Sequence, residues 1–375
     1  MNMAAAQESS QGVAQGHRVL VMAGGTGGHV FPALSVADFL HREGAVVTWM
    51  GTRKGIEAEL VPSRGYAIDF ITVRPLRGTG LRARWHGMMR VMVALWEAMR
   101  ILHRRKPDVV LGLGGFVSGP GGAASFLMRI PLAIHEQNTV PGTTNRILSR
   151  LAALVMEAFP GTFPPERHAR LTGNPVREAI ARLPVPELRF GQRKGRLRLL
   201  IIGGSQGAQS LNEIVPAAVA RLEAALQPEI WHQCGRGKQG GIDTIYKEAG
   251  IEARVDAFID DMAEAWEWAD LVIARAGAMT VSEIAAVGIG AILVPYPHAV
   301  DDHQTTNAAF LAEAGAARVF TEETLSPSGL AKMLGELFAD GRRQLLRMAR
   351  AARALAQADA TEAVALACLE ISRGR

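Results

Sequence analysis

Short apolar runs alternate with amphipathic stretches along the whole chain. The runs of the first half lie at 19–23, 46–51, 109–114, 131–136 and 153–159, and those of the second half at 197–204, 229–235, 253–259, 271–277 and 291–297. Between them the apolar positions recur with helical spacing, as in 32–44. Short buried strands that alternate with helices predict an α/β fold with parallel sheets covered on both faces.

One local pattern occurs twice, at 17–40 and 197–222: an apolar strand, a glycine-rich turn and an amphipathic helix. The first turn contains Gly24, Gly25, Thr26 and Gly28, which align with Gly203, Gly204, Ser205 and Gly207 of the second. Such a turn leaves backbone N–H groups at the positive end of a helix dipole, where phosphate binds. The repeat predicts two nucleotide-fold domains that face a shared cleft.

The chain length suits this division, because 375 residues are typical of two domains. We expect a disordered tail at 1–16, which lacks the basic and apolar regions of a signal peptide. The first domain is expected at 17–176 and the second at 177–357, with the C-terminal helix at 358–375 packing back on the first. The proline-rich stretch 183–195 is typical of a linker.

The composition sets further limits. The chain is 48% apolar and contains two cysteines, Cys234 and Cys368, which form neither a disulfide framework nor a zinc motif. Two cysteines without a disulfide framework fit a protein of a reducing compartment. No uninterrupted apolar run reaches the ~18 residues of a membrane span, so no transmembrane helix is expected.

Positive charge is concentrated in residues 74–106, which hold nine Lys or Arg residues and one acid, Glu97. Within 74–85, a glycine-broken sequence combines arginines with Leu76, Leu81 and Trp85, which predicts contact with an anionic membrane surface. For 87–105 we favour an ordinary amphipathic helix whose apolar stripe belongs to the core: Met88, Met92, Leu95, Met99 and Leu102. No nucleic-acid-binding module surrounds the basic residues, so no nucleic acid partner is expected.

The glycine turns do not match the common nucleotide motifs. The first reads GTGGHV at 25–30 and lacks the third glycine of the dinucleotide fingerprint, and no carboxylate closes the strand at 46–51. Neither turn is followed by a Walker lysine, so nucleotide hydrolysis is disfavoured. His135 and Glu136 begin a zinc-type motif, but Thr139 stands where its second histidine would be, and we expect no metal there or at 301–303.

Several motifs together resemble the MurG family of glycosyltransferases, from about residue 17 to 370. In chain order they are GGTGGHVFPALSVA, GGFVSGPGG, HEQN, GNPVR, GGSQGAQSLN, FIDDM, RAGAMTVSE and DDHQTTNA. The resemblance implies the GT-B arrangement of two Rossmann-like domains with a deep cleft. It also implies inverting transfer of GlcNAc from UDP-GlcNAc to the muramoyl C4 hydroxyl of lipid I, which forms lipid II for peptidoglycan. Neither a metal nor another cofactor is implied, and the place of action is the cytoplasmic face of the inner membrane, as a peripheral protein.

The resemblance assigns the acceptor side to the first domain. His29 is the candidate base for the acceptor hydroxyl, since the ordinary pKa of imidazole, ~6.5, suits proton transfer near neutral pH. A histidine that caps the helix or contacts phosphate is the alternative. Thr26, Gly27 and Gly28 are candidate phosphate contacts, or only a tight turn. Asn138 suits sugar hydroxyls because an amide both donates and accepts, and Arg177 suits the leaving diphosphate, with a plain surface arginine as its alternative.

The donor side is assigned to the second domain. The hydroxyl of Ser205 and the adjacent N–H groups would hold the donor diphosphate, although Ser205 also fits a helix N-cap. Glu283 would accept hydrogen bonds from the ribose hydroxyls. The other candidates are backbone contacts at Ala278, Met279 and Thr280, a uracil contact at Ile259, and a GlcNAc contact at Gln304. The family often carries a Gln-Gln pair at this last position, and here its first member is His303.

Other functions stay open on the sequence. A UDP-GlcNAc 2-epimerase or another UDP-sugar transferase shares the two-domain architecture. A non-enzymatic nucleotide-sugar-binding protein is a third class. The apolar-basic segment 74–85 argues against the epimerase, and the presence of both His29 and Glu283 argues against a protein without activity.

Overall fold

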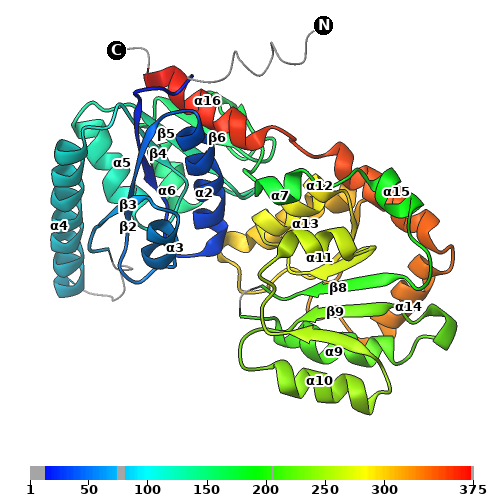
Figure 1. The fold of residues 1–375 in the computed structure, drawn as a ribbon. Coiled ribbons are helices and arrows are strands. Elements are labelled where there is room, and N and C mark those ends of the chain that lie inside the picture. Colours follow the sequence, from blue (N-terminus) through cyan, green and yellow to red (C-terminus); the bar gives the residue numbers. More distant parts are fainter. Residues whose placement is uncertain (1–12, 74–80, 205, 373–375) are drawn as a thin grey trace, which may run out of the picture. The chain divides into compact units, whose positions relative to one another are not determined.

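The computed structural model describes residues 13–73, 81–204 and 206–372, without the side chains of 81–87 and 300. The chain divides into two compact units, Met1–Arg177 with Asp359–Arg375, and Glu178–Ala358. Each unit is a parallel sheet with helices on both faces (Figure 1). The predicted pair of α/β domains with parallel sheets is therefore confirmed.

The first unit has the strand order β3-β2-β1-β4-β5-β6-β7. Its strands are β1 (Arg18–Met22), β2 (Val46–Gly51), β3 (Ala67–Phe70), β4 (Val109–Gly112), β5 (Leu132–Glu136), β6 (Leu154–Glu157) and β7 (Arg170–Leu171). Its helices are α2 (Gly27–Arg42), α3 (Glu57–Ser63), α4 (Leu81–Arg105), α5 (Ser118–Leu127), α6 (Thr143–Leu148), η1 (Pro165–Arg167) and α16 (Ala360–Ser372). From β1, strands β2 and β3 are added toward one edge of the sheet, and β4 to β7 toward the other. The order therefore changes direction between β1 and β4, and doubly wound folds bind ligands at such a point.

Successive residues of β1 pack on opposite faces of the sheet. Val19 and Val21 join a core with residues of α2 and α16, whereas Leu20 and Met22 join a core with residues of α4 and α5. A strand covered on both faces has no polar side to present, which explains the continuous apolar run at this position.

The C-terminal helix α16 packs in the first unit. Val364, Cys368 and Leu369 lie in the same core as the buried side chains of α2. At the other end of the chain, Ala14 is buried in this core as well. Residues 13–16, which were expected to belong to a disordered tail at 1–16, therefore form an ordered turn. Residues 1–12 lie outside the described part of the chain.

Helix α4 differs from its expected packing. Met88 and Met92 are exposed, by 62% and 55%, and Met99 is exposed too, so the apolar stripe predicted for the core is wrong in these members. Leu102 of the predicted stripe is buried in the core as expected, and Leu95 packs against it. Ala98 joins the same core, and Ala94 is buried as well. The helix also begins at Leu81, so 81–85 is not a loop; residues 74–80 lie outside the described chain.

The second unit has the strand order β10-β9-β8-β11-β12-β13. Its strands are β8 (Arg198–Ile202), β9 (Glu229–Gln233), β10 (Ala253–Asp256), β11 (Leu271–Ala274), β12 (Gly290–Leu293) and β13 (Ala317–Val319). Its helices are α7 (Glu178–Ala181), α8 (Pro186–Gly191), α9 (Gln209–Val219), η2 (Ala224–Leu226), α10 (Gln239–Glu248), α11 (Met262–Trp268), α12 (Ala278–Val287), η3 (Val300–Asp302), α13 (His303–Glu313), α14 (Pro327–Phe338) and α15 (Arg342–Ala354). Here the strand order changes direction between β8 and β11, as it does between β1 and β4 in the first unit.

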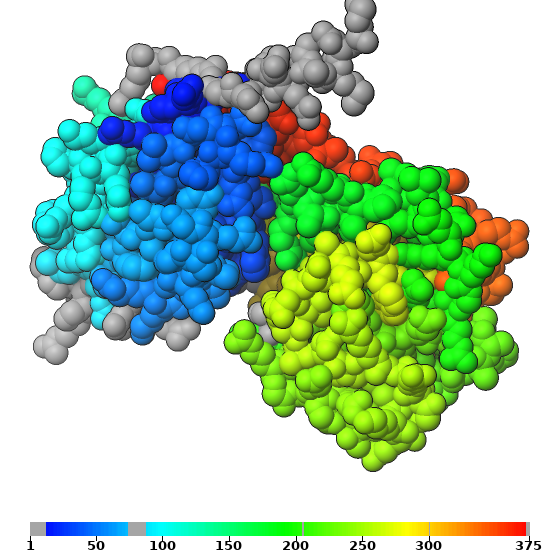
Figure 2. Space-filling model, viewed as in Figure 1, coloured from blue at the N-terminus to red at the C-terminus, as the bar shows by residue number. Residues whose placement is uncertain are grey.

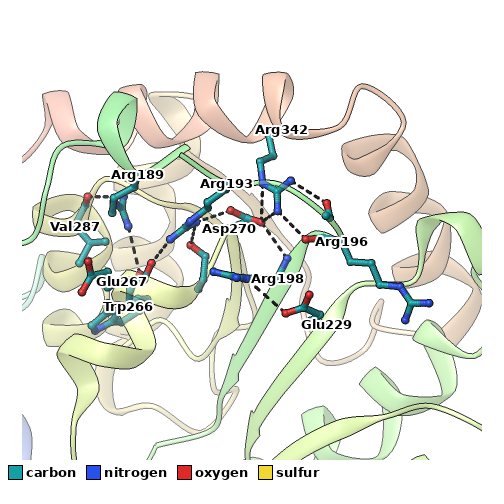
Figure 3. A network of polar contacts seen from close by, with 12 residues as sticks. Arg189, Arg193, Arg196, Arg198, Glu229, Trp266, Glu267, Asp270, Val287 and Arg342 are labelled. Atoms are coloured by element: carbon teal, nitrogen blue, oxygen red, sulfur yellow. Dashed lines mark hydrogen bonds and ion pairs between the residues drawn. The ribbon is translucent and has the colours of Figure 1, made fainter. Parts of the chain in front are cut away.

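A buried carboxylate fastens the linker-like stretch 183–195 to this second sheet (Figure 3). Asp270, which precedes β11, is fully buried and pairs with Arg193 and Arg342. It also accepts a hydrogen bond from the backbone N–H of Arg198 at 3.1 Å. Arg189 donates to the carbonyl oxygen of Val287 at 2.8 Å. The stretch 183–195 thus contains helix α8 and packs on the second unit.

Of the helices that the structure describes, none combines the length with the apolar composition that crossing a bilayer requires.

Candidate functional site

The residues predicted to bind substrate lie at the carboxyl ends of the parallel strands in each unit. In the first unit, the glycine loop follows β1, a second glycine loop follows β4, and the HEQN motif ends β5. Because β4 neighbours both β1 and β5, these three segments meet at one edge of the sheet. This edge includes the point of reversal, where open α/β sheets bind ligands.

The first glycine loop is supported from behind by Glu57, a residue that the sequence did not suggest. Glu57 is fully buried at the start of α3. Its Oε2 accepts a hydrogen bond from the backbone N–H of Gly25 at 2.9 Å, and its Oε1 accepts one from the N–H of Thr52 at 2.9 Å. The carboxylate therefore fixes the loop before Thr26, Gly27 and Gly28. Gly27 and Gly28 begin α2, whose first N–H groups have no acceptor within the helix.

Two glycines after β4 allow that loop to contact the first one. A Cβ atom on Gly114, where φ is +102°, would lie 2.6 Å from Nδ1 of His29. A Cβ atom on Gly115 would lie 2.4 Å from the carbonyl oxygen of Gly24. Gly114 thus lies directly against the imidazole, and the ring position depends on the absence of a side chain there.

His29 belongs to a chain of hydrogen bonds that runs into the protein interior. Its Nδ1 lies 3.0 Å from Oε1 of Gln137. Nε2 of Gln137 lies 3.1 Å from Nδ1 of His135, and Nε2 of His135 lies 2.9 Å from the carbonyl oxygen of Gly173. Both Gln137 and His135 are buried, and burial lowers the pKa of His135 to about 4. His135 is therefore neutral at physiological pH.

Glu136 organises the segment that carries Asn138. Its Oε1 accepts hydrogen bonds from the backbone N–H and the Nδ2 of Asn138, at 3.1 and 3.2 Å. Its Oε2 accepts one from the N–H of Gly142 at 3.1 Å, and one from Nδ2 of Asn145 at 2.9 Å. The acid of the HEQN motif is thus used for loop structure, and the side-chain orientation of Asn138 is set by it.

Arg177 lies close to the first turn of α2. Its guanidinium carbon is 5.4 Å from the ring centroid of Phe31, which is on that turn. Among the predicted groups of the first unit, the loop at 26–28 and His29 are adjacent at the start of α2. Asn138 follows Gln137, whose side chain contacts His29, and Arg177 contacts Phe31 of the same helix.

In the second unit, the loop after β8 is locked to the end of β9. A Cβ atom on Gly207 would lie 1.9 Å from the carbonyl oxygen of Cys234, and Nε2 of Gln233 donates to the carbonyl oxygen of Gly204 at 3.0 Å. Among the described residues, no side chain caps the following helix α9, whose N-cap is Ala208. Ser205 itself lies outside the described chain.

Helix α12 begins at the carboxyl end of β11, and Ala278, Met279 and Thr280 form its first turn. Its N-cap is Gly277, and no described side chain caps it. Nδ2 of Asn307 donates to the carbonyl oxygen of Ala276 at 3.2 Å, which joins the start of α13 to this turn. The turn that begins α12 is thus tied to helix α13.

A polar cluster beside this turn consists of Arg275, Glu322 and Ser210. Arg275 pairs with Glu322 and donates to the carbonyl oxygen of Pro295 at 3.2 Å. Ser210 donates to Glu322 at 2.7 Å. Burial acts to raise the pKa of Glu322, but the hydrogen bonds from Ser210 and Arg275 outweigh it, so the pKa is lowered. The sequence indicated Arg275 only as part of a motif and did not indicate Glu322.

Glu283 lies about two turns into α12 and is 9% exposed. Its Oε2 accepts a hydrogen bond from Nε1 of Trp266, on α11, at 3.1 Å. A carboxylate held in this way keeps one orientation, which suits recognition of a vicinal diol.

The remaining candidates are Ile259, on the loop after β10, and Gln304, at the start of α13. Ile259 follows β10 and has a buried side chain, so only its backbone can meet a ligand. It precedes Asp261, whose side chain caps α11 by accepting from the N–H groups of Ala263 and Glu264. Gln304, in the first turn of α13, accepts a hydrogen bond from the N–H of Tyr296 at 3.0 Å through Oε1. The described residues contain no group of three or more His, Cys, Asp or Glu side chains placed to hold a metal ion.

Sequence reasoning missed Glu57, Gln137 and Trp266. Gln137 carried a weak signal, because it stands in a polar run that directly follows a buried strand. Glu57 and Trp266 carried none, since their partners Gly25 and Glu283 are 32 and 17 residues away.

Comparison with known proteins gives matches to both units. Residues 19–157 match the glycosyltransferase family 28 N-terminal domain, and residues 198–364 match the glycosyltransferase family 28 C-terminal domain. A protein from Nitrosococcus oceani is 55% identical over 357 residues, which are 95% of this chain and 99% of that protein. A protein from Marinobacter nauticus is 51% identical, over 95% of this chain and 98% of that protein. Both carry the name UDP-N-acetylglucosamine–N-acetylmuramyl-(pentapeptide) pyrophosphoryl-undecaprenol N-acetylglucosamine transferase.

Solved structures agree with these relatives. The crystal structure of MurG from Acinetobacter baumannii has a TM-score of 0.83 and 41% identity, covering 94% of this chain and 99% of that one. The calicheamicin glycosyltransferase CalG4 has a TM-score of 0.65 at 17% identity, covering 94% of this chain and 98% of that one, and it shows the likeness of fold alone.

Proposed function

This chain belongs to the MurG family of glycosyltransferases, within glycosyltransferase family 28, and we propose that it transfers N-acetylglucosamine from UDP-GlcNAc to the muramoyl sugar of an undecaprenyl-diphosphate-linked acceptor. The product is lipid II, the precursor of peptidoglycan. The observation that carries this proposal is the match across both units, at 55% identity over 95% of the chain, to a protein that bears this activity in its name.

The chemistry can be written for the residues of the first unit. The acceptor oxygen bonds to C1 of GlcNAc as the bond from C1 to the diphosphate oxygen breaks, and the electron pair leaves with UDP. Nε2 of His29 takes the proton of the C4 hydroxyl, as a general base. Attack on the face opposite the leaving group inverts the configuration at C1. Arg177, whose guanidinium lies over Phe31 of α2 on the same unit, supplies positive charge for a diphosphate.

The second unit holds the donor in this proposal. The starts of α9 and α12 offer backbone N–H groups, and the described residues provide no side-chain cap at either. These amides, with Ser205, bind the diphosphate. Glu283 binds the ribose hydroxyls, the backbone at Ile259 binds uracil, and Gln304 binds GlcNAc, as Asn138 does from the first unit.

A membrane surface on the first unit fits a lipid-linked acceptor. The outer face of α4 exposes Met88, Met92 and Trp96, and Trp96 is 60% exposed. Arg100 lies over the ring of Trp96, 5.6 Å from its centroid. Figure 2 shows α4 at the surface of this unit, in cyan. We place the chain at the cytoplasmic face of the inner membrane, attached peripherally through this helix and the basic segment 74–85.

The activity is tested by incubating the purified chain with radiolabelled UDP-GlcNAc and a short-chain lipid I analogue. Label in a lipid product supports the proposal. Conversion of UDP-GlcNAc to its 2-epimer without transfer would instead indicate the epimerase, and binding of UDP-GlcNAc without any product would indicate a protein without catalytic function. His29→Ala is the control for a background transferase in the preparation.

The membrane surface is tested by sedimentation with vesicles of phosphatidylglycerol and of phosphatidylcholine. The double variant Met92→Ser/Trp96→Ser is expected to lose most of its binding to the anionic vesicles, as is charge reversal at Arg77, Arg82 and Arg84. Leu188→Ser, at a 58% exposed position of α8, is the matched control. Unchanged binding of both surface variants would contradict the assignment.

A further inference from the structure

The hydrogen bonds between His29 and Gly173 form a chain in which each donor can be identified. The carbonyl oxygen of Gly173 can only accept, so Nε2 of His135, 2.9 Å away, must carry a hydrogen. Burial lowers the pKa of His135 to about 4, so the ring carries one hydrogen near neutral pH. Nδ1 of His135 therefore presents a lone pair.

That lone pair determines how the side-chain amide of Gln137 is oriented. The atom 3.1 Å from Nδ1 of His135 must be a donor, and it also lies 3.2 Å from the backbone carbonyl oxygen of His135. Two acceptors thus require the NH2 group at this place. Nδ2 of Asn174 donates to the backbone oxygen of Gln137 at 2.9 Å, which holds the residue itself. Gln137 is 1% exposed, so water does not compete for the amide.

The amide oxygen of Gln137 consequently faces His29. Oε1 lies 3.0 Å from Nδ1 of His29 and can only accept, so this nitrogen carries a hydrogen. Gly114 supports the same ring position, because it leaves room for the imidazole where a Cβ atom would lie 2.6 Å from Nδ1. No described residue donates to or accepts from Nε2 of His29, which keeps that nitrogen available to a substrate.

We propose that Gln137 and His135 are positioning residues, which hold the His29 imidazole in the tautomer with hydrogen on Nδ1 and the lone pair on Nε2. This inference rests on the proposed role of His29 as the base. The Gly173 carbonyl sets the tautomer of His135, and His135 sets the orientation of the Gln137 amide. The amide oxygen in turn sets the tautomer of His29. The base is then ready in the form that can accept a proton, since neutral imidazole has a lone pair on only one nitrogen.

The hydrogen-bond partner of the His29 imidazole is the side-chain amide of Gln137 rather than a carboxylate. A carboxylate would favour the imidazolium, whereas a neutral amide orients the ring without adding a negative charge. The charged side chains of the adjoining segments have other partners: Glu57 bonds to Gly25, Glu136 bonds to Asn138 and Asn145, and Arg177 lies over Phe31. The amide therefore orients the imidazole and places no charge beside it.

The tautomer can be observed directly in the full chain labelled with ¹⁵N-histidine. Long-range ¹H–¹⁵N correlation spectra distinguish the two tautomers, and the spectra of His29→Gln and His135→Gln assign the signals. We expect hydrogen on Nδ1 of His29 and on Nε2 of His135. Hydrogen on Nε2 of His29 in the wild-type chain would overturn the proposal. This reading needs no substrate, so it is independent of the transferase assay.

Kinetics of two Gln137 variants test the role. In Gln137→Glu, the acidic limb of the kcat/KM pH profile is expected to move to higher pH by about one unit or more, because an opposite charge at this distance favours the imidazolium. In Gln137→Leu, kcat is expected to fall about tenfold or more, with the KM for UDP-GlcNAc changed less than about twofold. Ser125→Ala, which removes a part-buried hydrogen bond elsewhere in this unit, should change neither.

Each result decides between a positioning role and a purely structural one. The proposal would be overturned if Gln137→Glu had the circular dichroism spectrum of the wild type and an acidic limb of its kcat/KM pH profile at the wild-type pH. If the wild-type chain transferred no GlcNAc, the proposed function would fail, and the NMR spectra would still decide the tautomer.

Discussion

Trp266 donates a hydrogen bond from its indole nitrogen to the carboxylate of Glu283 at 3.1 Å, and so orients the group that we assign to the donor ribose. The bond joins α11 to α12. Because both residues are at most 9% exposed, the carboxylate has a fixed direction before any donor binds.

We expect Glu283→Ala to raise the KM for UDP-GlcNAc by about tenfold or more, with a smaller effect on kcat, since hydrogen bonds to a charged group contribute about 1.5–3 kcal/mol. Trp266→Phe should raise this KM less, because the carboxylate remains but loses its orientation. Steady-state kinetics with varied donor check both variants. A KM for donor that stays at the wild-type value in Glu283→Ala would remove the ribose assignment.

His29→Ala is expected to lower kcat by about 10²–10⁴-fold, the usual contribution of a general base. Donor affinity should hardly change, because UDP-GlcNAc is assigned to the other unit. Isothermal titration with UDP-GlcNAc and single-turnover transfer measure the two quantities. Equal losses in turnover and in affinity would argue for a phosphate contact instead of a base.

Gly114→Ala is expected to lower kcat by about tenfold or more, since a displacement of a catalytic group by about 1 Å can cost 10²-fold. A Cβ atom there would meet the imidazole at 2.6 Å. Gly65→Ala is the matched control: it has a similarly positive φ, +82°, but no atom within 4 Å of the added Cβ. If both variants lost activity alike, backbone strain rather than contact with His29 would be the cause.

Asp270→Ala should destabilise the second unit by about 3–5 kcal/mol, because it leaves Arg193 and Arg342 without their buried partner. Urea unfolding of the full chain measures the change. Asp243→Ala, at an exposed pair with Lys247, should stay within about 0.5 kcal/mol of the wild type. A similar midpoint for the two variants would contradict the structural role of Asp270.

Stability is expected to fall as the pH drops below 6.5. His232 is buried between Tyr246 and Asn212, and burial lowers its pKa to about 3. The unfolded chain binds a proton to this histidine below pH 6.5 and the folded chain does not, so unfolding becomes easier by up to about 1.4 kcal/mol per pH unit. The contribution is complete above pH 6.5 and is lost progressively toward pH 3.

His232→Gln should weaken this dependence between pH 7.5 and 5.0, as measured by urea midpoints. The exposed His103 provides the control, since His103→Gln removes a side chain that water solvates in both states. An equal pH dependence in wild type and His232→Gln would show that other groups carry it.

The strands were predictable because both sheets are covered on both faces. Val46–Gly51 was predicted with its observed bounds, and β1 within one residue at each end. Several other predicted strands run too far at their carboxyl ends. Residues there, such as Leu113 and Val294, are as buried as strand residues, and hydrophobicity alone does not distinguish a buried turn from a strand.

The packing of α4, unlike the strands, could not be predicted from the sequence. Its sequence has a helical stripe of methionines, and this period is correct, but the sheet contacts the alanine side. Helical periodicity identifies an apolar face and does not say whether that face meets the core or a different surface. A large exposed apolar face suggests a binding surface.

The sequence by itself determined the repeated α/β design, the glycine loops and the family, because these depend on local pattern and on motifs that stay contiguous. Only the tertiary structure decided which groups support the candidate site: Glu57 behind Gly25, Gln137 beside His29, and Trp266 beside Glu283. Each pair joins residues that are remote in the chain. A hydrogen bond requires two atoms within about 3 Å in a defined direction, and that geometry exists only once the sheets have folded.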